Sequence, residues 1–194
     1  MQCAACAEKR CYSEGKDCSP QPDLAKQVRQ ELRKKRNAQF CGISSILEAE
    51  HYMKLTRLDE TALFARRMKF SHIGIAFCVG LSDEAKALHG ILSKTFRVSS
   101  VCCKICGIDK KEMGLPNIKP DRYEAMCNPI GQAIVLNKAN TDMNVILGLC
   151  VGHDMLFTRY SRAPVTTLVA KDRVLAHNPV AAMTNRYYLR KQAA

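Results

Sequence analysis

The chain has 194 residues, of which 47% are hydrophobic and 25% are charged, and its formal net charge is +12. This length fits one globular domain with a small appendage, and the composition is ordinary for a soluble globular protein. No apolar run approaches the roughly eighteen residues that a membrane-spanning helix requires, and the cysteine-rich start does not read as a signal sequence. We therefore expect a cytoplasmic protein with no membrane partner.

Four cysteines open the chain, at Cys3, Cys6, Cys11 and Cys18, in a polar stretch that has no apolar segment to build a core. Such a loop cannot fold by burial alone, whereas four thiolates closing on one cation convert metal affinity into folding free energy. The chain has eleven cysteines, an odd number, and stable disulfides are rare in a reducing compartment. We predict a metal-binding segment over residues 1–22 that holds either zinc or an iron–sulfur cluster.

Residues 23–70 are predicted to form a helical segment. A basic helix is expected over residues 23–37, a second helix over 42–54, and a third from Thr56 onward. Six lysines and arginines within residues 26–36 give the first helix a charge that suits nucleic acid or an acidic partner. Few aromatic residues lie nearby to stack on bases, so a solvated helix face is favoured over nucleic-acid binding.

Residues 71–194 alternate short apolar runs with amphipathic ones, which predicts an α/β domain. The expected strands are 72–78, 96–102, 144–150 and 165–170, and the expected helices are 82–94, 129–139, 152–160 and 180–189. This alternation implies right-handed crossovers and a mainly parallel, Rossmann-like sheet of four or more strands with helices on both faces. No G-x-G-x-x-G fingerprint or Walker-type loop follows the first strand, which disfavours nucleotide binding.

Cysteines stand at the ends of three predicted strands and in the loop before the 129–139 helix. Because the carboxyl ends of parallel strands meet at one edge of a sheet, we expect these thiols to converge on a crevice there. Thiolates suit zinc or an iron–sulfur cluster better than magnesium or calcium, which prefer oxygen ligands. The predicted cofactor-binding residues are Cys78, Cys103, Cys106, Cys127 and Cys150.

Each of these cysteines can also be interpreted as a buried, inert residue, because free cysteine is among the most buried residue types. For Cys41, which stands alone on its helix, burial is favoured. Adjacent residues of a strand face opposite ways, so only one of Cys102 and Cys103 can easily reach the crevice.

Four polar residues are candidates for catalysis at the same edge. His153 could serve as a base for a nucleophilic or sulfur-carrying thiolate, while Asp154 could simply favour the positive end of its helix. Lys171 and Arg173 could hold a small anionic ligand, or they could belong to a surface turn. The sequence leaves these alternatives open.

Several long motifs resemble those of one family. They are Cys3-Ala-Ala-Cys6, Ile73-Gly-Ile-Ala-Phe-Cys78, Val101-Cys-Cys-Lys-Ile-Cys106, Cys127-Asn-Pro-Ile-Gly-Gln-Ala133, Leu149-Cys-Val-Gly-His-Asp154 and Lys171-Asp-Arg173. Together they are similar to the bacterial and archaeal domain of unknown function numbered eighteen-forty-seven, whose members are labelled uncharacterised metal-binding proteins. The resemblance covers nearly the whole chain and implies metal binding without an established reaction, with iron–sulfur favoured over zinc.

These observations lead to three hypotheses. The leading one is a metalloprotein whose sheet-edge cysteines carry out redox or sulfur chemistry on a small anionic ligand. The alternative is a zinc-stabilised binding module whose basic helix engages nucleic acid or an acidic protein. The third is a thiol enzyme with no metal in the crevice.

Overall fold

A computed structural model describes residues 1–193 of the chain. The protein forms two compact units, Met1–Lys54 and Leu55–Ala194. Among the described residues, no helix combines the length and the apolar character needed to cross a bilayer.

The first unit is helical. Its elements are η1 (Cys3–Ala5), α1 (Arg10–Ser13), α2 (Leu24–Arg33) and α3 (Lys35–His51). The predicted basic helix is shorter than expected, because Lys34 adopts an extended backbone and the Asn37 side chain donates to the Glu31 carbonyl at the break. The basic side chains of α2 are exposed, and a nucleic-acid partner for them stays a prediction.

Cys41 lies exposed on α3, so the expectation that it is buried is wrong. The apolar side chains of α3 do not gather on one face of the helix, and among its residues Leu47 alone is buried. Without a continuous apolar stripe, a helix has no single face to turn towards a core.

The second unit alternates helices and strands in the predicted order. Its elements are α4 (Arg57–Arg67), β1 (His72–Phe77), η2 (Val79–Leu81), α5 (Ser82–Leu92), β2 (Arg97–Cys102), η3 (Lys111–Met113), α6 (Pro129–Lys138), β3 (Met143–Leu147), α7 (His153–Tyr160), β4 (Val165–Val169), α8 (Val180–Thr184) and α9 (Arg186–Ala193). The helix predicted over 180–189 is two short helices, because Asn185 is extended and its side chain accepts from the Tyr187 amide to begin α9.

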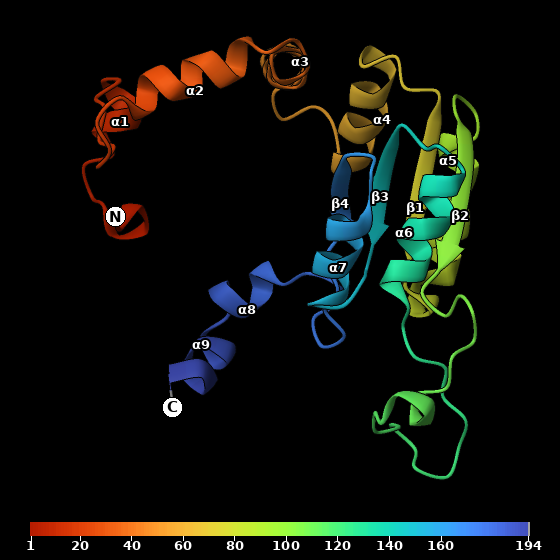
Figure 1. Ribbon diagram of the computed structural model, residues 1–194. Helices are drawn as coiled ribbons and strands as arrows, with labels where there is room; N and C mark the ends of the chain where they lie inside the picture. Colours follow the sequence, from red (N-terminus) through yellow and green to blue (C-terminus); the bar gives the residue numbers. More distant parts are fainter. Residues whose placement is uncertain (194) are drawn as a thin grey trace. The chain divides into compact units, whose positions relative to one another are not determined.

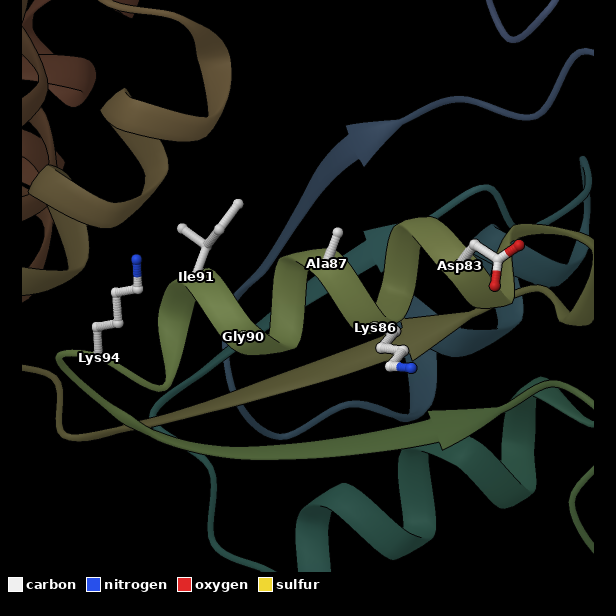
Figure 2. Close-up of a pocket in the computed structure, with 6 residues that line it drawn as sticks. All are labelled: Asp83, Lys86, Ala87, Gly90, Ile91 and Lys94. Carbon is white, nitrogen blue, oxygen red and sulfur yellow. The ribbon is translucent and has the colours of Figure 1, made fainter.

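The four strands form one parallel sheet in the order β2-β1-β3-β4, which confirms the predicted fold class (Figure 1). Right-handed crossovers put α5 on one face and α6 and α7 on the other, and α5 and α6 lie on opposite sides of the strands in Figure 2. The chain first moves from β1 to β2, then crosses back to β3. The switch point, where ligands bind in such sheets, is therefore the carboxyl end of β1 and β3.

The amino edge of the sheet is closed by a polar network. One carboxylate oxygen of Asp142 accepts from the amides of Ser71 and His72 at 2.7 and 2.9 Å, and from the Ser71 hydroxyl at 3.0 Å. Arg97 donates to His72 Nδ1 at 2.6 Å, and His72 Nε2 lies 2.9 Å from the Ser99 hydroxyl. Because a guanidinium can only donate, His72 is neutral and carries its proton on Nε2.

This network fixes the protonation of its members. Burial and the Arg97 charge lower the pKa of His72, which is only 4% exposed. Burial alone would raise the pKa of Asp142, but the hydrogen bonds from Ser71 and His72 outweigh it and lower that pKa. Both side chains therefore favour their deprotonated forms in the folded protein.

Candidate functional site

Four cysteines reach the carboxyl edge of the sheet from four segments of the chain. Cys78 follows β1, Cys103 follows β2, Cys127 precedes α6 and Cys150 follows β3. We call these four residues the crevice thiols; the first two are buried and the last two are half-buried. Arg173 shares their surroundings, because Cys150, through a hydrogen bond and its charge, and then Cys78 and Cys127 raise the pKa of its guanidinium.

Two of the crevice thiols form a close pair. The Sγ atoms of Cys103 and Cys127 lie 3.8 Å apart, although the residues are 24 positions apart in the chain. The Cys103 sulfur also accepts from the Val79 amide at 3.3 Å. The amide of Asn128 donates to the Cys103 carbonyl at 2.7 Å, and the Asn128 side chain caps α6. These contacts hold the two cysteine backbones against each other.

The positive charges near the pair act mainly on the sulfur of Cys127. The Lys104 ammonium lies 3.6 Å from its sulfur and is held in place by the Ala125 carbonyl. A hydrogen bond from the Cys103 thiol is the largest cause that lowers the pKa of Cys127, to about 5, and the charges of Lys104 and His153 act in the same direction. The buried Cys103 thiol keeps its proton, since donating to Cys127 and burial both raise its pKa.

The segment between the paired cysteines closes on itself. Asp109 and Ala125 form an isolated antiparallel bridge, and the Lys110 ammonium lies 2.7 Å from the Glu124 carboxylate. The Tyr123 hydroxyl donates to the Gly107 carbonyl at 2.6 Å. We call this segment, residues 104–126, the arm.

Two cations from the loop after β4 contact the other two crevice thiols. The Lys171 ammonium donates to Cys78 at 3.3 Å, and the Arg173 guanidinium donates to Cys150 at 3.0 Å. The carboxylate of Asp172, which stands between them in the sequence, accepts from the amides at positions 174 and 175 instead. It closes the turn and leaves both cations facing sulfur.

The remaining predicted residues lie in different surroundings. His153 is the first residue of α7 and is near enough for its charge to act on Cys127. Asp154 accepts from the amide of the next residue in the first turn of α7, as the helix-end interpretation expects. Cys106 is exposed in a left-handed turn, at φ 74°, and has no part in the sulfur contacts found within residues 1–193. Cys102 packs half-buried against the core, so Cys103 is the member of the adjacent pair that reaches the crevice.

The opening quartet of Cys3, Cys6, Cys11 and Cys18 is exposed. Within the described part of the chain, no three histidine, cysteine, aspartate or glutamate side chains lie close enough to hold a metal ion. The crevice thiols have the donor chemistry that zinc or an iron–sulfur cluster requires, but only Cys103 and Cys127 form a close sulfur pair. Metal binding at either place stays a prediction.

Sequence reasoning missed two residues of the site. Lys104 follows Cys103 directly, and a cation beside a thiol was a signal for thiolate stabilisation that could have been used. Gln132 on α6 is fully buried, and its side-chain amide donates to the carbonyls of Phe77 and Val101 at 3.1 and 2.7 Å. It joins the ends of β1 and β2 beside the crevice, and no sequence pattern distinguishes such a glutamine from a surface one.

A surface groove of about 630 Å³ runs along the outer face of α5 (Figure 2). Its lining is Asp83, Lys86, Ala87, Gly90, Ile91 and Lys94. The groove has no thiol and no histidine, so the chemically distinctive groups of this unit are those of the crevice.

Comparisons with known proteins agree with the motifs. The chain is 51% identical over 191 residues to an uncharacterised protein of Methanocaldococcus jannaschii, covering 98% of this chain and 97% of that protein. No solved structure matches the chain. A family model described as "Protein of unknown function (DUF1847)" matches residues 17–168, a range that includes all four crevice thiols. The chain belongs to this family.

Proposed function

We propose that the protein uses its crevice thiols for redox or sulfur chemistry on a small anionic ligand. The observation that carries this proposal is that every crevice thiol has a nitrogen donor at its sulfur. The pairs are Cys78 with Lys171, Cys103 with the Val79 amide, Cys127 with Lys104, and Cys150 with Arg173.

Such surroundings favour a reactive thiol over an inert one. The thiolate is the nucleophilic form of cysteine, and nearby lysine, arginine and histidine charges stabilise it. A structural cysteine is a small apolar residue that needs no cation beside it. The positive charges of Lys104, Lys171 and Arg173 would also attract a ligand of negative charge to the switch point of the sheet.

Alkylation with two reagents of similar size tests this proposal. Iodoacetate is anionic and iodoacetamide is neutral, so a cationic crevice should favour iodoacetate. We expect the iodoacetate-to-iodoacetamide rate ratio at half-buried Cys127 and Cys150, measured by mass spectrometry, to exceed the ratio at exposed Cys41 on the order of tenfold at low salt, and to fall as salt is added.

Matched variants sharpen this measurement. Arg173→Gln should reduce the ratio at Cys150, whereas Lys86→Gln, on the exposed face of α5, should leave it unchanged. Equal ratios at the crevice thiols and at Cys41 would contradict the proposal.

A metal site is the second candidate function. It is supported by the spacing of the opening quartet and by the short helical turns of residues 3–13, which have no buried residue to stabilise them. Iron, zinc and acid-labile sulfide should be measured on anaerobically purified protein, together with its visible spectrum. We expect Cys6→Ser to lose metal and Cys41→Ser to retain it; full-length protein that is free of all three would remove this candidate.

A further inference from the structure

We infer that Cys103 and Cys127 are a redox-active dithiol, which closes to a disulfide by exchange with an anionic disulfide substrate. This inference rests on the proposed function and names its reaction and substrate class. The 3.8 Å between the two Sγ atoms is the closest sulfur approach in the crevice for which a contact is found.

The backbone around the pair favours closure. A disulfide bond is about 2 Å long, so the two sulfurs must approach by less than the width of one atom. The hydrogen bond from the Asn128 amide to the Cys103 carbonyl, at 2.7 Å, already fixes the two backbones side by side. This hydrogen bond keeps the two sulfurs near each other, which is the arrangement that closure needs.

The surroundings of the two sulfurs give them different roles. Cys127 is half-buried and lies beside the Lys104 ammonium, so its thiolate is accessible and stabilised. Cys103 is only 2% exposed and cannot meet a substrate first. Cys127 is therefore the attacking thiol and Cys103 the resolving thiol.

The exchange balances without another reactant. The Cys127 thiolate attacks one sulfur of the substrate disulfide, the substrate S–S bond breaks, and the first substrate thiolate leaves with the electron pair. Cys103 loses its proton and attacks the Cys127 sulfur, which breaks the mixed disulfide and releases the second substrate thiolate. The protein dithiol loses two electrons, the substrate disulfide gains them, and the two product thiolates take up the Cys103 proton and one solvent proton.

The charge of the crevice selects the substrate. The ammonium groups of Lys104 and Lys171 and the guanidinium of Arg173 each contact a crevice sulfur. The Asp172 carboxylate, which is hydrogen-bonded within its own turn, offsets only one of these three charges. A disulfide whose organic groups carry carboxylates is therefore favoured over a cationic one.

Two disulfide probes of opposite charge test the inference on the reduced full chain. Glutathione disulfide carries carboxylates and cystamine carries ammonium groups. After acid quenching and disulfide mapping by mass spectrometry, we expect a Cys103–Cys127 disulfide that forms on the order of tenfold faster with glutathione disulfide at low salt. Cys41→Ser and Cys102→Ser should behave as the unmodified protein does.

Single variants separate the two roles. Cys103→Ser, or Cys103→Ala if serine unfolds the protein, should trap a stable mixed disulfide on Cys127. Cys127→Ser should leave Cys103 in neither a mixed nor an internal disulfide. A mixed disulfide on Cys103, an internal disulfide that joins Cys103 or Cys127 to another cysteine instead, or equal rates with both probes would overturn the inference.

The alkylation test described above decides the proposed function independently of this disulfide test. If no Cys103–Cys127 disulfide forms but the crevice thiols still prefer iodoacetate, the inference fails and the proposed function stands. If that preference is also absent, both fail.

Discussion

The two edges of the same parallel sheet hold ionisable groups in opposite ways. At the amino edge, His72 and Asp142 are bound into hydrogen bonds with backbone amides and neighbouring side chains. At the carboxyl edge, Lys171 and Arg173 meet only the polarisable sulfurs of cysteines within the contacts described. The first arrangement stabilises one protonation state of each group and serves the fold, while the second leaves two cations beside thiols.

The two edges are separated by the length of a strand. The six residues of β1 span about 20 Å, which exceeds the screening length of about 8 Å at physiological ionic strength. Changes at one edge should therefore leave the other edge undisturbed, and each prediction below tests that separation.

The largest effect should come from removing the carboxylate of the amino edge. Asp142→Ala leaves two amides and the Ser71 hydroxyl without their acceptor, and we expect about 2–4 kcal/mol less free energy of unfolding in urea denaturation. Asp121→Ala, at an exposed loop position, is the control and should cost under about 0.5 kcal/mol. Alkylation of the crevice thiols should not change. A loss no greater than that of the control would remove the structural role of this edge.

Acidification should destabilise the protein through the same edge. His72 and Asp142 both have lowered pKa values when folded, so the unfolded chain takes up their protons first. Stability should therefore be complete at neutral pH, decline as the pH falls below the ordinary histidine value of 6.5, and decline again below the ordinary aspartate value of 3.8. Each proton contributes at most about 1.4 kcal/mol per pH unit.

Urea midpoints measured between pH 7 and pH 3 would check this dependence. His72→Gln should flatten the upper part of the curve and Asp142→Ala the lower part. An unchanged curve in both variants would assign acid sensitivity to other groups.

At the carboxyl edge, the expected effect is on reactivity. A pKa of about 5 keeps Cys127 ionised at pH 6, whereas an ordinary thiol is then almost fully protonated. Because a thiolate of low pKa is also a weaker nucleophile, the net advantage of Cys127 over exposed Cys41 towards iodoacetamide at pH 6 should be about tenfold.

Removing one charge should reduce that advantage. Lys104→Gln should raise the pKa of Cys127 and move its alkylation profile to higher pH, while Lys86→Gln should not. A profile of Cys127 that coincides with that of Cys41 in the unmodified protein would contradict this account of the carboxyl edge.

The smallest effect should be on stability when a crevice thiol is lost. Cys150 is half-buried and its partner Arg173 is exposed, so Cys150→Ser should change the free energy of unfolding by about 0.5 kcal/mol or less. A loss comparable to that of Asp142→Ala would show that the two edges are not separated in function.

The sequence predicts much of this arrangement. Alternating apolar runs and helices specify a parallel sheet, and that topology alone brings the ends of β1, β2 and β3 together with Cys78, Cys103 and Cys150. The convergence of these thiols is therefore a consequence of strand direction, which is readable from spacing.

Other features depend on backbone turns that the sequence marks weakly. Cys106 adopts a positive φ although it is not glycine, and this turn leaves it exposed. The break at Lys34 has no glycine or proline to announce it. The pairing of Cys103 with Cys127 depends on the path of the intervening arm, which has no periodic pattern to read.

The arm, residues 104–126, is held together by its own contacts and is joined at its base. Its own bridge and ion pair, Asp109 to Ala125 and Lys110 to Glu124, bind it internally, while its two ends are fastened together at Cys103 and Asn128. Because the two ends of the arm are joined next to Cys103 and Cys127, a change in the length of the arm has little leverage on the distance between the two sulfurs.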